Sequence, residues 1–459
     1  MPSHSPIRLL GTILTAALIS ACGDEGSSPI VPVEEPPISK DQFLSQDKVL
    51  SYFVAQSDAE KPDFAPAQMH REVIEEHESE EVKEVFWSLW HKANEKALGE
   101  IGFEGSERLI QLSLPQDEQM KVLCVPRAKK PATGYPLIIH LHGGGRYPNE
   151  PGPWTSTINE DEWRIHQAFC RTRYPEDPSY FVVPRMSDDR KGRWYFAPQV
   201  HIFKKVIKLG MLSGNIDPER IHVIGISEGG YGILRMGMFM PDYFSSIGVL
   251  AAAEELNGAE VNLRHLPFRM EVGENDFGYA RNTYAYHWDD RMKELHAAYP
   301  NEYPHLVRIQ KGRGHSINYF EGFPWMMEQR RKANPDRISY LYANIAPDYD
   351  DIHGRFSDGV YFIDFRGLKT SDRTDKMMFE VHKEGNTYDI KTQMLKGNIS
   401  GKIALFIDRI ERDKPVVVRL NGKTVHDRRV RATRGAIAES IALYGDPKRI
   451  YSSRVEIDL

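Results

Sequence analysis

The chain has few of the residues that mark a disulfide-rich or a nucleic-acid-binding protein. Three cysteines in 459 residues are too few for a disulfide framework. A net charge of -6 and a sequence pI near 6.3 leave no excess of basic residues, which argues against nucleic acid as a partner. The hydrophobic content of 41% is ordinary for a soluble globular protein, and the length allows two domains with additional segments.

Hydrophobic runs long enough to span a bilayer are also lacking, even at the N-terminus. Arg8 supplies a positive charge, and residues 9–18 form an apolar core with the length of a secretory signal. The Ile-Ser-Ala-Cys sequence that follows, ending at Cys22, resembles a bacterial lipobox, in which the cysteine becomes lipid-modified. The sequence predicts a signal peptide over 1–21 and a lipidated Cys22 with a Pro/Glu-rich tether over 22–40. We expect an exported lipoprotein anchored in the outer membrane, on its periplasmic or surface-exposed face; the alternative is an ordinary signal peptide.

The motif on which the rest of the interpretation depends is Gly-Ile-Ser-Glu-Gly over residues 225–229. An apolar, β-branched run precedes it, and a helix-like segment over residues 230–240 follows. This is the Gly-x-Ser-x-Gly signature of a nucleophile elbow, with the strand and the helix that it requires. A sharp turn holds the serine in a strained conformation, so only glycine fits two residues to either side. We predict that Ser227 is a nucleophile and that the backbone N–H of Glu228 points toward an oxyanion.

Such a nucleophile needs a glycine-rich oxyanion loop upstream in the chain. The continuous apolar run over residues 136–141 is typical of a strand buried on both faces of a parallel sheet. It ends in His-Gly-Gly-Gly over residues 142–145, where the small residues let backbone N–H groups approach a substrate carbonyl oxygen. We predict that Gly143, Gly144 and Glu228 form the oxyanion hole.

An acid and a histidine follow Ser227 in the required order. A strand-like run over residues 267–272 leads into Gly-Glu-Asn-Asp, and its Asp276 is the best-placed carboxylate. Glu274 and Asp289 are less favoured alternatives, and Asp276 also fits an ordinary helix N-cap. His315 lies on a Gly-flanked loop just past the next strand. We predict that it is the general base.

Strands alternate with helices through the middle of the chain, which predicts a doubly wound, mostly parallel α/β sheet. Between two of the strands, residues 146–177 are interpreted as a long insertion of the kind that often shapes binding sites. The expected strands are 108–114, 120–125, 136–141, 181–184, 221–226, 247–253, 267–272 and 305–310, and the expected helices are 200–212, 230–240 and 286–298.

Aromatic residues near these loops have two interpretations. Trp154, Trp163, Trp194 and Tyr195 either form a platform for a sugar or feruloyl group or lie in the core beneath a long loop. The pattern does not decide between them. Trp154, Trp194 and Tyr195 are therefore retained as candidate substrate-binding residues.

Two further pairs of residues, one of histidines and one of cysteines, give weaker evidence about function. His140 and His142 have the spacing of metal ligands, but no nearby Asp or His completes a site, so no metal or other cofactor is predicted. Cys124 and Cys170 either pair in an oxidising compartment or remain buried as free thiols.

The flanking regions show other patterns. Residues 41–106 have apolar residues at helical spacing and no catalytic constellation, so this helical segment either packs on the following domain or helps to recognise substrate. Residues 338–459 contain short alternating strands, and Asn421-Gly422 is a strong hairpin signal. These strands predict a β-sandwich that either contacts carbohydrate or braces the catalytic domain. The expected strands are 338–343, 359–365, 377–382, 387–393, 399–407, 415–420 and 423–425.

The motifs around Ser227, Asp276 and His315 resemble those of bacterial α/β-hydrolases over about residues 107–337. They are most similar to secreted esterases of the feruloyl/acetylxylan esterase and polyhydroxybutyrate depolymerase type, which overlap the prolyl oligopeptidase-like clan. The C-terminal part resembles a β-sandwich appended to some exported bacterial hydrolases. The resemblance implies an α/β-hydrolase fold and a catalytic triad without a cofactor. Two features of the chain differ from the family pattern. A carboxylate directly follows the nucleophile, and the triple glycine leaves open which backbone N–H donates to the oxyanion.

These patterns favour a serine hydrolase that cleaves carboxylic esters through an acyl-enzyme. The expected substrate is a small-molecule or polysaccharide-linked ester, with a carbohydrate or aryl group. A serine peptidase of the prolyl oligopeptidase-like clan is second, because nothing in the chain resembles the propeller domain usual in oligopeptidases. A binding lipoprotein that keeps a hydrolase scaffold without catalysis is the alternative from another class.

Overall fold

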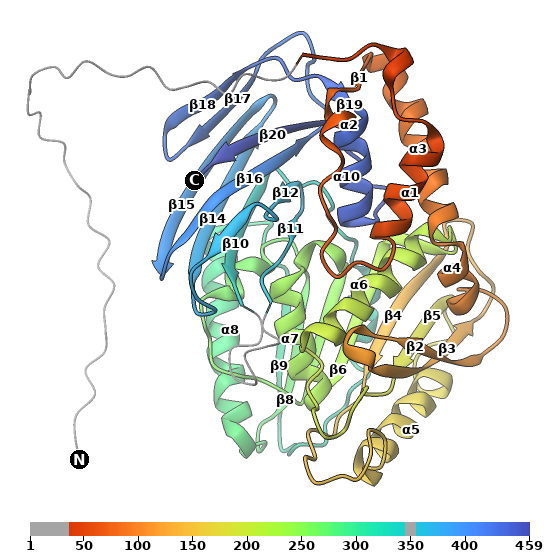
Figure 1. The fold of residues 1–459 in the computed structure, drawn as a ribbon. Helices are drawn as coiled ribbons and strands as arrows, with labels where there is room; N and C mark the ends of the chain where they lie inside the picture. The colour runs from red at the N-terminus through yellow and green to blue at the C-terminus, as the bar shows by residue number, and fades with distance from the viewer. Residues whose placement is uncertain (1–35, 345–354) are drawn as a thin grey trace, which may run out of the picture. The chain divides into compact units, whose positions relative to one another are not determined.

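The computed structural model describes residues 36–344 and 355–459 (Figure 1). Residues 37–459 belong to one compact unit. Cys22, the predicted signal peptide and most of the predicted tether lie outside the described residues. Within the described ranges, no helix combines the length and the apolar character needed to cross a membrane.

An eight-stranded sheet forms the centre of the fold. Its strands are β2 (Arg108–Ser113), β3 (Gln119–Arg127), β4 (Tyr135–Leu141), β5 (Ser179–Pro184), β6 (Ile216–Ile226), β7 (Ser246–Leu250), β8 (Phe268–Gly273) and β9 (His305–Gln310). They lie in the order β2-β3-β5-β4-β6-β7-β8-β9. β3 pairs antiparallel with β2 and with β5, and all other neighbours are parallel. The predicted mostly parallel sheet is therefore present.

Helices cover both faces of this sheet, which explains why its strands are apolar on both sides. Alternate residues of β4 show the division: Leu137 and Ile139 join one hydrophobic cluster, and Ile138 joins another. The first cluster includes α6 (Ala197–Leu212), α7 (Glu228–Phe239) and α8 (Arg281–Ala298); the second includes α5 (Thr157–Thr172) and α9 (Phe323–Glu328). Each of α6, α7 and α8 begins a few residues earlier than predicted.

The helix α5 corrects the prediction of a long loop over residues 146–177. Ser156 caps the helix, because its side chain accepts a hydrogen bond from the Asn159 N–H. The buried residues Asn159, Trp163, His166 and Cys170 recur at spacings of four and three, which places them on one helical face. This helical spacing was present in the sequence, but the prolines and glycines on either side favoured the prediction of a loop.

The two cysteines of the central sheet region are free and buried. Cys124 on β3 belongs to the cluster beneath α6 and α7, whereas Cys170 on α5 belongs to the cluster on the opposite face. Since the sheet lies between the two thiols, they do not pair. The open question of a disulfide is thereby answered.

The elbow strand begins earlier than predicted. β6 starts at Ile216, which pairs with Tyr135, and the next paired residues are Ile221 and Leu137. The pairing is therefore irregular between these two points. Residues 217–220, whose sequence is typical of a turn, form an irregularity within β6.

The C-terminal part contains two five-stranded sheets. One has the order β10-β14-β15-β17-β18, and in the other β11-β12-β16-β13 is extended by β20, which pairs with β16. Residues of both sheets, such as Phe379 and Leu405, share one hydrophobic cluster. The bounds are β10 (Arg337–Ala343), β11 (Gly359–Val360), β12 (Ile363–Asp364), β13 (Leu368–Thr370), β14 (Lys376–Glu384), β15 (Thr387–Lys396), β16 (Ile399–Ile407), β17 (Val416–Leu420), β18 (Lys423–Arg428) and β20 (Ser453–Asp458).

The predicted hairpin between β17 and β18 is confirmed. Asn421 and Gly422 have φ values of 51° and 83°, as a tight hairpin turn requires. Sequence analysis missed α10 (Arg434–Tyr444), in which every residue is buried. A helix buried all round has no polar face, so its periodicity does not show in the sequence.

The N-terminal helices α1 (Gln46–Gln56), α2 (Ala67–Arg71) and α3 (Ser79–Ala93) pack mainly on α10, as Figure 1 shows. The next helix, α4 (Glu95–Ile101), contacts α6 of the central region instead, and β1 (Val73–Ile74) pairs with β19 (Ala432–Thr433). Phe53 and Trp90 share a hydrophobic cluster with Ile437 and Ile441 of α10. Short 3-10 helices lie at Lys40–Gln42, Glu76–Glu78, Pro115–Asp117, Pro241–Tyr243, Ala259–Leu263 and Gly278–Ala280.

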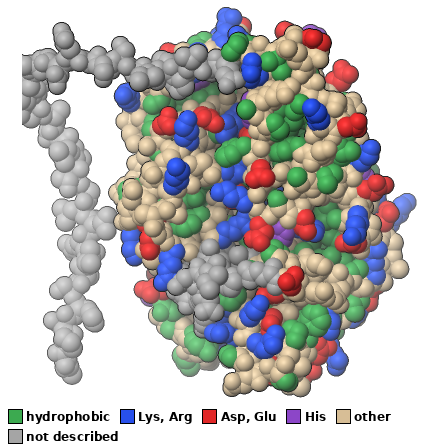
Figure 2. Space-filling model, viewed as in Figure 1, with side chains coloured by type: hydrophobic (Ala, Val, Ile, Leu, Met, Phe, Trp, Pro, Cys, Tyr) green, Lys and Arg blue, Asp and Glu red, His purple; other side chains and the backbone are tan. Residues whose placement is uncertain are grey.

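The surface carries charges of both signs. On the face drawn in Figure 2, Lys and Arg side chains are interspersed with Asp and Glu, and hydrophobic side chains form small patches between them. Neither sign of charge forms a continuous field on this face.

Candidate active site

Ser227 lies at the sharp turn between β6 and α7. Its φ of 53° and ψ of −115° are rare for a residue with a side chain, as expected of a nucleophile elbow. A Cβ atom on Gly225 would lie 2.0 Å from the carbonyl oxygen of Gly229, and one on Gly229 would lie 2.3 Å from that of Leu141. Both positions therefore require glycine, which is the steric reason for the motif.

A chain of hydrogen bonds joins Ser227 to two residues that lie far away in the sequence. Ser227 Oγ is 3.0 Å from Nε2 of His315, and Nδ1 of His315 is 2.7 Å from Oδ2 of Asp276. The side chain of His315 is 46% exposed, whereas that of Asp276 is 2% exposed. The site therefore opens to solvent at the histidine and buries its carboxylate.

Asp276 also accepts two hydrogen bonds from one arginine. Nε and Nη2 of Arg281 lie 2.9 and 2.7 Å from the two carboxylate oxygens. Burial raises the pKa of Asp276, but the hydrogen bonds from Arg281 and His315 outweigh burial and lower this pKa below its usual value. The carboxylate is therefore ionised at neutral pH and oriented from both sides.

The structure does not support Glu274 or Asp289 as the acid of the triad, nor an N-cap role for Asp276. Glu274 accepts a hydrogen bond from the Gly312 N–H at 2.8 Å, and Asp289 pairs with Lys293 at 2.6 Å, so each carboxylate is engaged elsewhere. The N-cap position of α8 is Ala280, so the N-cap interpretation of Asp276 is wrong.

The loop after β4 is oriented by its own histidine. Nε2 of His142 accepts a hydrogen bond from the Met186 N–H at 3.1 Å, so the proton is assigned to Nδ1, which donates to the Gly143 carbonyl at 2.7 Å. Burial lowers the pKa of His142 to about 3, which keeps the ring neutral. Because C=O and N–H point in opposite directions across a trans peptide, this bond sets the direction of the Gly144 N–H.

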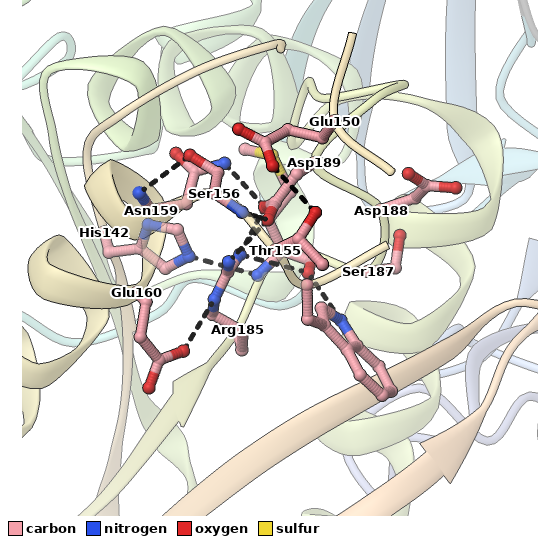
Figure 3. A network of polar contacts seen from close by, with 12 residues as sticks. His142, Glu150, Thr155, Ser156, Asn159, Glu160, Arg185, Ser187, Asp188 and Asp189 are labelled. Atoms are coloured by element: carbon pink, nitrogen blue, oxygen red, sulfur yellow. Dashed lines mark hydrogen bonds and ion pairs between the residues drawn. The ribbon is translucent and has the colours of Figure 1, made fainter. Parts of the chain in front are cut away.

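A buried polar network holds the same loop from behind (Figure 3). The Asn159 side chain accepts from the Gly145 N–H at 2.9 Å and donates to the Gly145 carbonyl at 3.0 Å and to Asp189 at 2.6 Å. Asp189 also accepts from the Ser156 N–H at 2.9 Å, and two guanidinium nitrogens of Arg185 lie 2.7 and 2.8 Å from its oxygens. The glycine loop is thus tied to an interior ion pair before substrate binds.

Sequence analysis did not single out Glu162, a residue of α5 that borders the site. A Cβ atom on Gly143 would lie 2.8 Å from Oε2 of Glu162 and 3.3 Å from Cβ of Ser227, so both side chains flank this glycine. Burial raises the pKa of Glu162, whereas the charge of His315 and the Gly143 N–H act in the opposite direction. Only recognition of α5 as a helix would have placed Glu162 near Asn159 and the loop.

Glu228, the residue after the nucleophile, begins α7. Its carboxylate forms an ion pair with Arg193, and the side chain is almost fully buried. Burial raises the pKa of Glu228, and the arginine opposes this effect. The carboxylate that departs from the family pattern is therefore engaged in an ion pair, and its backbone N–H lies at the helix N-terminus.

Trp194 and Tyr195 are core residues, which corrects their interpretation as a substrate platform. Trp194 is 0% exposed and donates its indole N–H to the His142 carbonyl at 3.0 Å. Tyr195 is also buried, and the Arg235 guanidinium lies 4.2 Å from its ring centroid. The side chains support the loop and α7 from within, where no substrate ring can stack on them.

The other two tryptophans differ from each other. Trp163 is buried and donates its indole N–H to the Val183 carbonyl at 3.0 Å, so it is also a core residue. Trp154 is half-buried; it donates to the Met186 carbonyl at 3.2 Å, and the Lys121 ammonium lies 4.2 Å from its ring centroid. Of the predicted platform, only Trp154 keeps part of its surface in solvent.

The histidines near β4 form hydrogen bonds rather than a metal site. His140 bonds the Tyr174 hydroxyl at 2.7 Å and His166 at 3.0 Å, and burial lowers the pKa of His140 to about 3. Over residues 36–344 and 355–459, no three His, Cys, Asp or Glu side chains are grouped as metal ligands would be.

Neither protein-family models nor curated proteins match this chain. Among solved structures it is similar to a thermostable esterase, with 16% identity, 49% of this chain covered and a TM-score of 0.37. The chain spans 63% of the length of that esterase. It is also similar to a poly(3-hydroxybutyrate) depolymerase from Bordetella parapertussis, with 15% identity, 48% of this chain and 87% of that chain covered, and a TM-score of 0.36.

A third similar structure is a fluorophosphonate-binding serine hydrolase from Staphylococcus aureus. Its identity is 13%, 49% of this chain and 100% of that chain are covered, and the TM-score is 0.34. Since all three likenesses are distant, what the site can do is inferred below from its own geometry.

Proposed function

We propose that the protein is a serine hydrolase that cleaves carboxylic esters through an acyl-enzyme. The observation that carries this proposal is the hydrogen-bonded chain from Ser227 through His315 to Asp276, mounted on a strained strand-to-helix turn. A serine in such a chain gains a general base, and the base gains a carboxylate that orients it.

In the proposed reaction, Ser227 Oγ attacks the ester carbonyl while Nε2 of His315 takes its proton. Asp276 holds the proton on Nδ1 and stabilises the imidazolium that forms. The same proton then passes to the leaving alcohol, and an acyl-enzyme remains on Ser227. Water, activated by His315, hydrolyses this intermediate.

The oxyanion is assigned to backbone donors. The candidates are the N–H of Glu228 at the start of α7 and that of Gly144, since the predicted donor Gly143 directs its N–H at the carboxylate of Glu162. The bonds from His142 and Asn159 support this assignment, because they orient the loop before the reaction begins. The loss of one such donor raises the barrier by about 2.7–4 kcal/mol in comparable sites.

The substrate class and the location are further parts of the proposal. The resemblance of the motifs to secreted esterases supports an aryl or carbohydrate ester, free or linked to a polysaccharide. The lipobox-like sequence that ends at Cys22 supports an exported protein anchored in the outer membrane.

The test uses a soluble form that begins after Cys22. Hydrolysis of p-nitrophenyl acetate, p-nitrophenyl butyrate and methyl ferulate is compared for the wild type and Ser227→Ala. We expect ester turnover by the wild type only, together with labelling of Ser227 by a fluorophosphonate. Silence on all esters without labelling would favour a binding protein on a hydrolase scaffold.

One observation favours a second candidate, a serine peptidase that acts on an aminoacyl group. The carboxylate of Glu162 lies beside Gly143 and Ser227, where it can pair with a substrate ammonium group. An aminoacyl p-nitroanilide separates the two candidates. Cleavage of the anilide at a rate comparable to the esters, lost in Glu162→Gln, would move the assignment to a peptidase.

A further inference from the structure

A cavity of about 400 Å³ lies between α3 and the C-terminal sheets. Its walls come from α3, from the segment before β10, from β14 and β15, from the end of β16, and from the segment after α10. None of the residues around Ser227 line it. Its volume is in the range of small-molecule binding sites, and three separate parts of the chain must come together to form it.

One side of the cavity is aromatic. Phe362 and Tyr388 meet edge to face with ring centroids 5.8 Å apart, and Phe406 and Tyr451 stack at 5.7 Å. Trp87 of α3 adds a half-exposed indole. Trp87 is the ring that a sugar can reach, because the exposed fractions of Phe362, Tyr388, Phe406 and Tyr451 are only 1–5%. An indole packs well against the C–H face of a sugar ring, since both surfaces are flat and weakly polar.

Two cations at the cavity form no ion pair in the described part of the chain, although the Lys383 ammonium lies 5.7 Å from the ring centroid of Tyr388. The side chains of Lys383, which is half-buried, and Arg409, which is exposed, form no hydrogen bond or ion pair with any described residue. By contrast, the nearby Lys83 is paired with Glu80 at 2.8 Å and with Asp408 at 2.9 Å. Unpaired cations beside an apolar wall are suited to a carboxylate ligand.

Tyr388 supplies an independent indication. The residue is 1% exposed, yet its hydroxyl has no hydrogen-bond partner among the described residues, and it lines the cavity. The hydroxyl is not among the fully buried side-chain atoms that lack a partner, so it is open to the cavity and free to bond a ligand. The carboxylate of Glu84, also at the cavity and unpaired within the described ranges, adds an acceptor for hydroxyl groups.

We propose that this cavity binds a uronic acid residue of an acidic glycan. Lys383 and Arg409 hold its carboxylate, the indole of Trp87 packs against one face of its ring, and Tyr388 and Glu84 bond its hydroxyls. Binding here is separate from ester hydrolysis at Ser227. The cavity anchors the glycan while the active site acts on another substituent.

Calorimetric titration tests this proposal with the Ser227→Ala protein, which keeps the test independent of the proposed hydrolysis. Trigalacturonate is compared with xylotriose, a neutral sugar with the same number of rings. We expect the acidic sugar to bind at least tenfold more tightly, with an affinity that falls as salt rises. Equal affinity for both sugars, or no heat from either, would overturn the proposal.

Variants then locate the binding. Arg409→Gln and Lys383→Gln are each expected to weaken trigalacturonate binding about tenfold, because each removes one charge-assisted hydrogen bond. Arg429→Gln is the matched control, since this exposed arginine lies outside the cavity. Circular dichroism checks that all variants are folded. Unchanged binding in both cavity variants would refute the site, and ferulate binding as tightly as the uronate would refute the sugar assignment.

Discussion

The two loops that flank Ser227 are held in different ways. The glycine loop after β4 is tied through Asn159 to the Arg185–Asp189 pair, whose side chains are both 0% exposed. The loop after β8 reaches the surface, but its Asp276 is only 2% exposed and is held by Arg281, which is 9% exposed. Tyr279 in this second loop is 85% exposed and has a φ of 52°. One loop is therefore supported by the protein interior, and the other by a local ion pair.

Because the two loops are held differently, their disruption should affect folding stability and catalytic activity to different degrees. Removal of one member of a fully buried ion pair leaves an uncompensated charge in the interior, so the whole fold is affected. The pair in the loop after β8 is also mostly buried, but its aspartate contacts the catalytic histidine directly. Disruption of the interior support should therefore mainly lower stability, and disruption of the loop after β8 should mainly lower activity, with a smaller loss of stability.

The largest expected effect comes from Asp276→Asn in the loop after β8. An amide cannot stabilise the imidazolium, and it favours the wrong tautomer of His315, so kcat should fall by about 10⁴-fold. The melting temperature should also fall, because the amide leaves Arg281, whose side chain is 9% exposed, without its charged partner. Steady-state kinetics and thermal unfolding check both parts, with Asp289→Asn as a control that should retain full activity. A kcat within tenfold of the wild type would contradict the assignment of the acid.

The next effect is on stability. Arg185→Met removes half of the interior pair and should lower the free energy of unfolding by about 3–5 kcal/mol. Urea titration measures the change. Arg171→Met is the matched control, because Arg171 pairs with Glu107 at the surface, where the two side chains are 38% and 40% exposed, and its loss should leave stability nearly unchanged. Similar losses of unfolding free energy in both variants would show that the stabilisation does not depend on burial of the ion pair.

A smaller effect is expected where the network meets the glycine loop. Asn159→Ala removes the bonds to both backbone groups of Gly145, so the oxyanion donors lose their orientation. We expect kcat to fall about tenfold or more while KM changes little, because the loop acts mainly in the transition state. The exposed neighbour Asp161→Asn should behave as the wild type. A change confined to KM would indicate a role in substrate binding instead.

The smallest effect concerns Glu162. Burial raises its pKa, so its contribution favours the folded state below the pKa of the unfolded chain and is lost as pH rises through the folded pKa. Glu162→Gln should therefore melt at a higher temperature than the wild type at pH 7, with the difference vanishing below about pH 4. For neutral esters, kcat/KM should also rise, because a negative charge beside the oxyanion is removed. A melting difference that is independent of pH would refute this account.

Much of the local structure could be predicted because its causes are local. Gly225 is required by a backbone contact with Gly229, four residues further on, and Asn421-Gly422 has the φ values of its own turn. Gly229 is instead required by the distant Leu141 of β4, although the motif made it recognisable in the sequence. The apolar runs of the central sheet and the order of serine, acid and histidine are visible along the chain. These features indicate which segments belong together without any knowledge of their packing.

The burial of particular side chains was decided only by the tertiary structure. Trp194 became a core residue because His142 and α7 surround it, and α10 became a helix without a polar face because two other regions cover it. The Arg185–Asp189 pair and the position of Glu162 likewise depend on elements that are distant in the sequence. Sequence patterns determined which conformations the chain can adopt locally; the free energy of desolvation, which depends on every neighbour, determined where charges and aromatic rings finally lie.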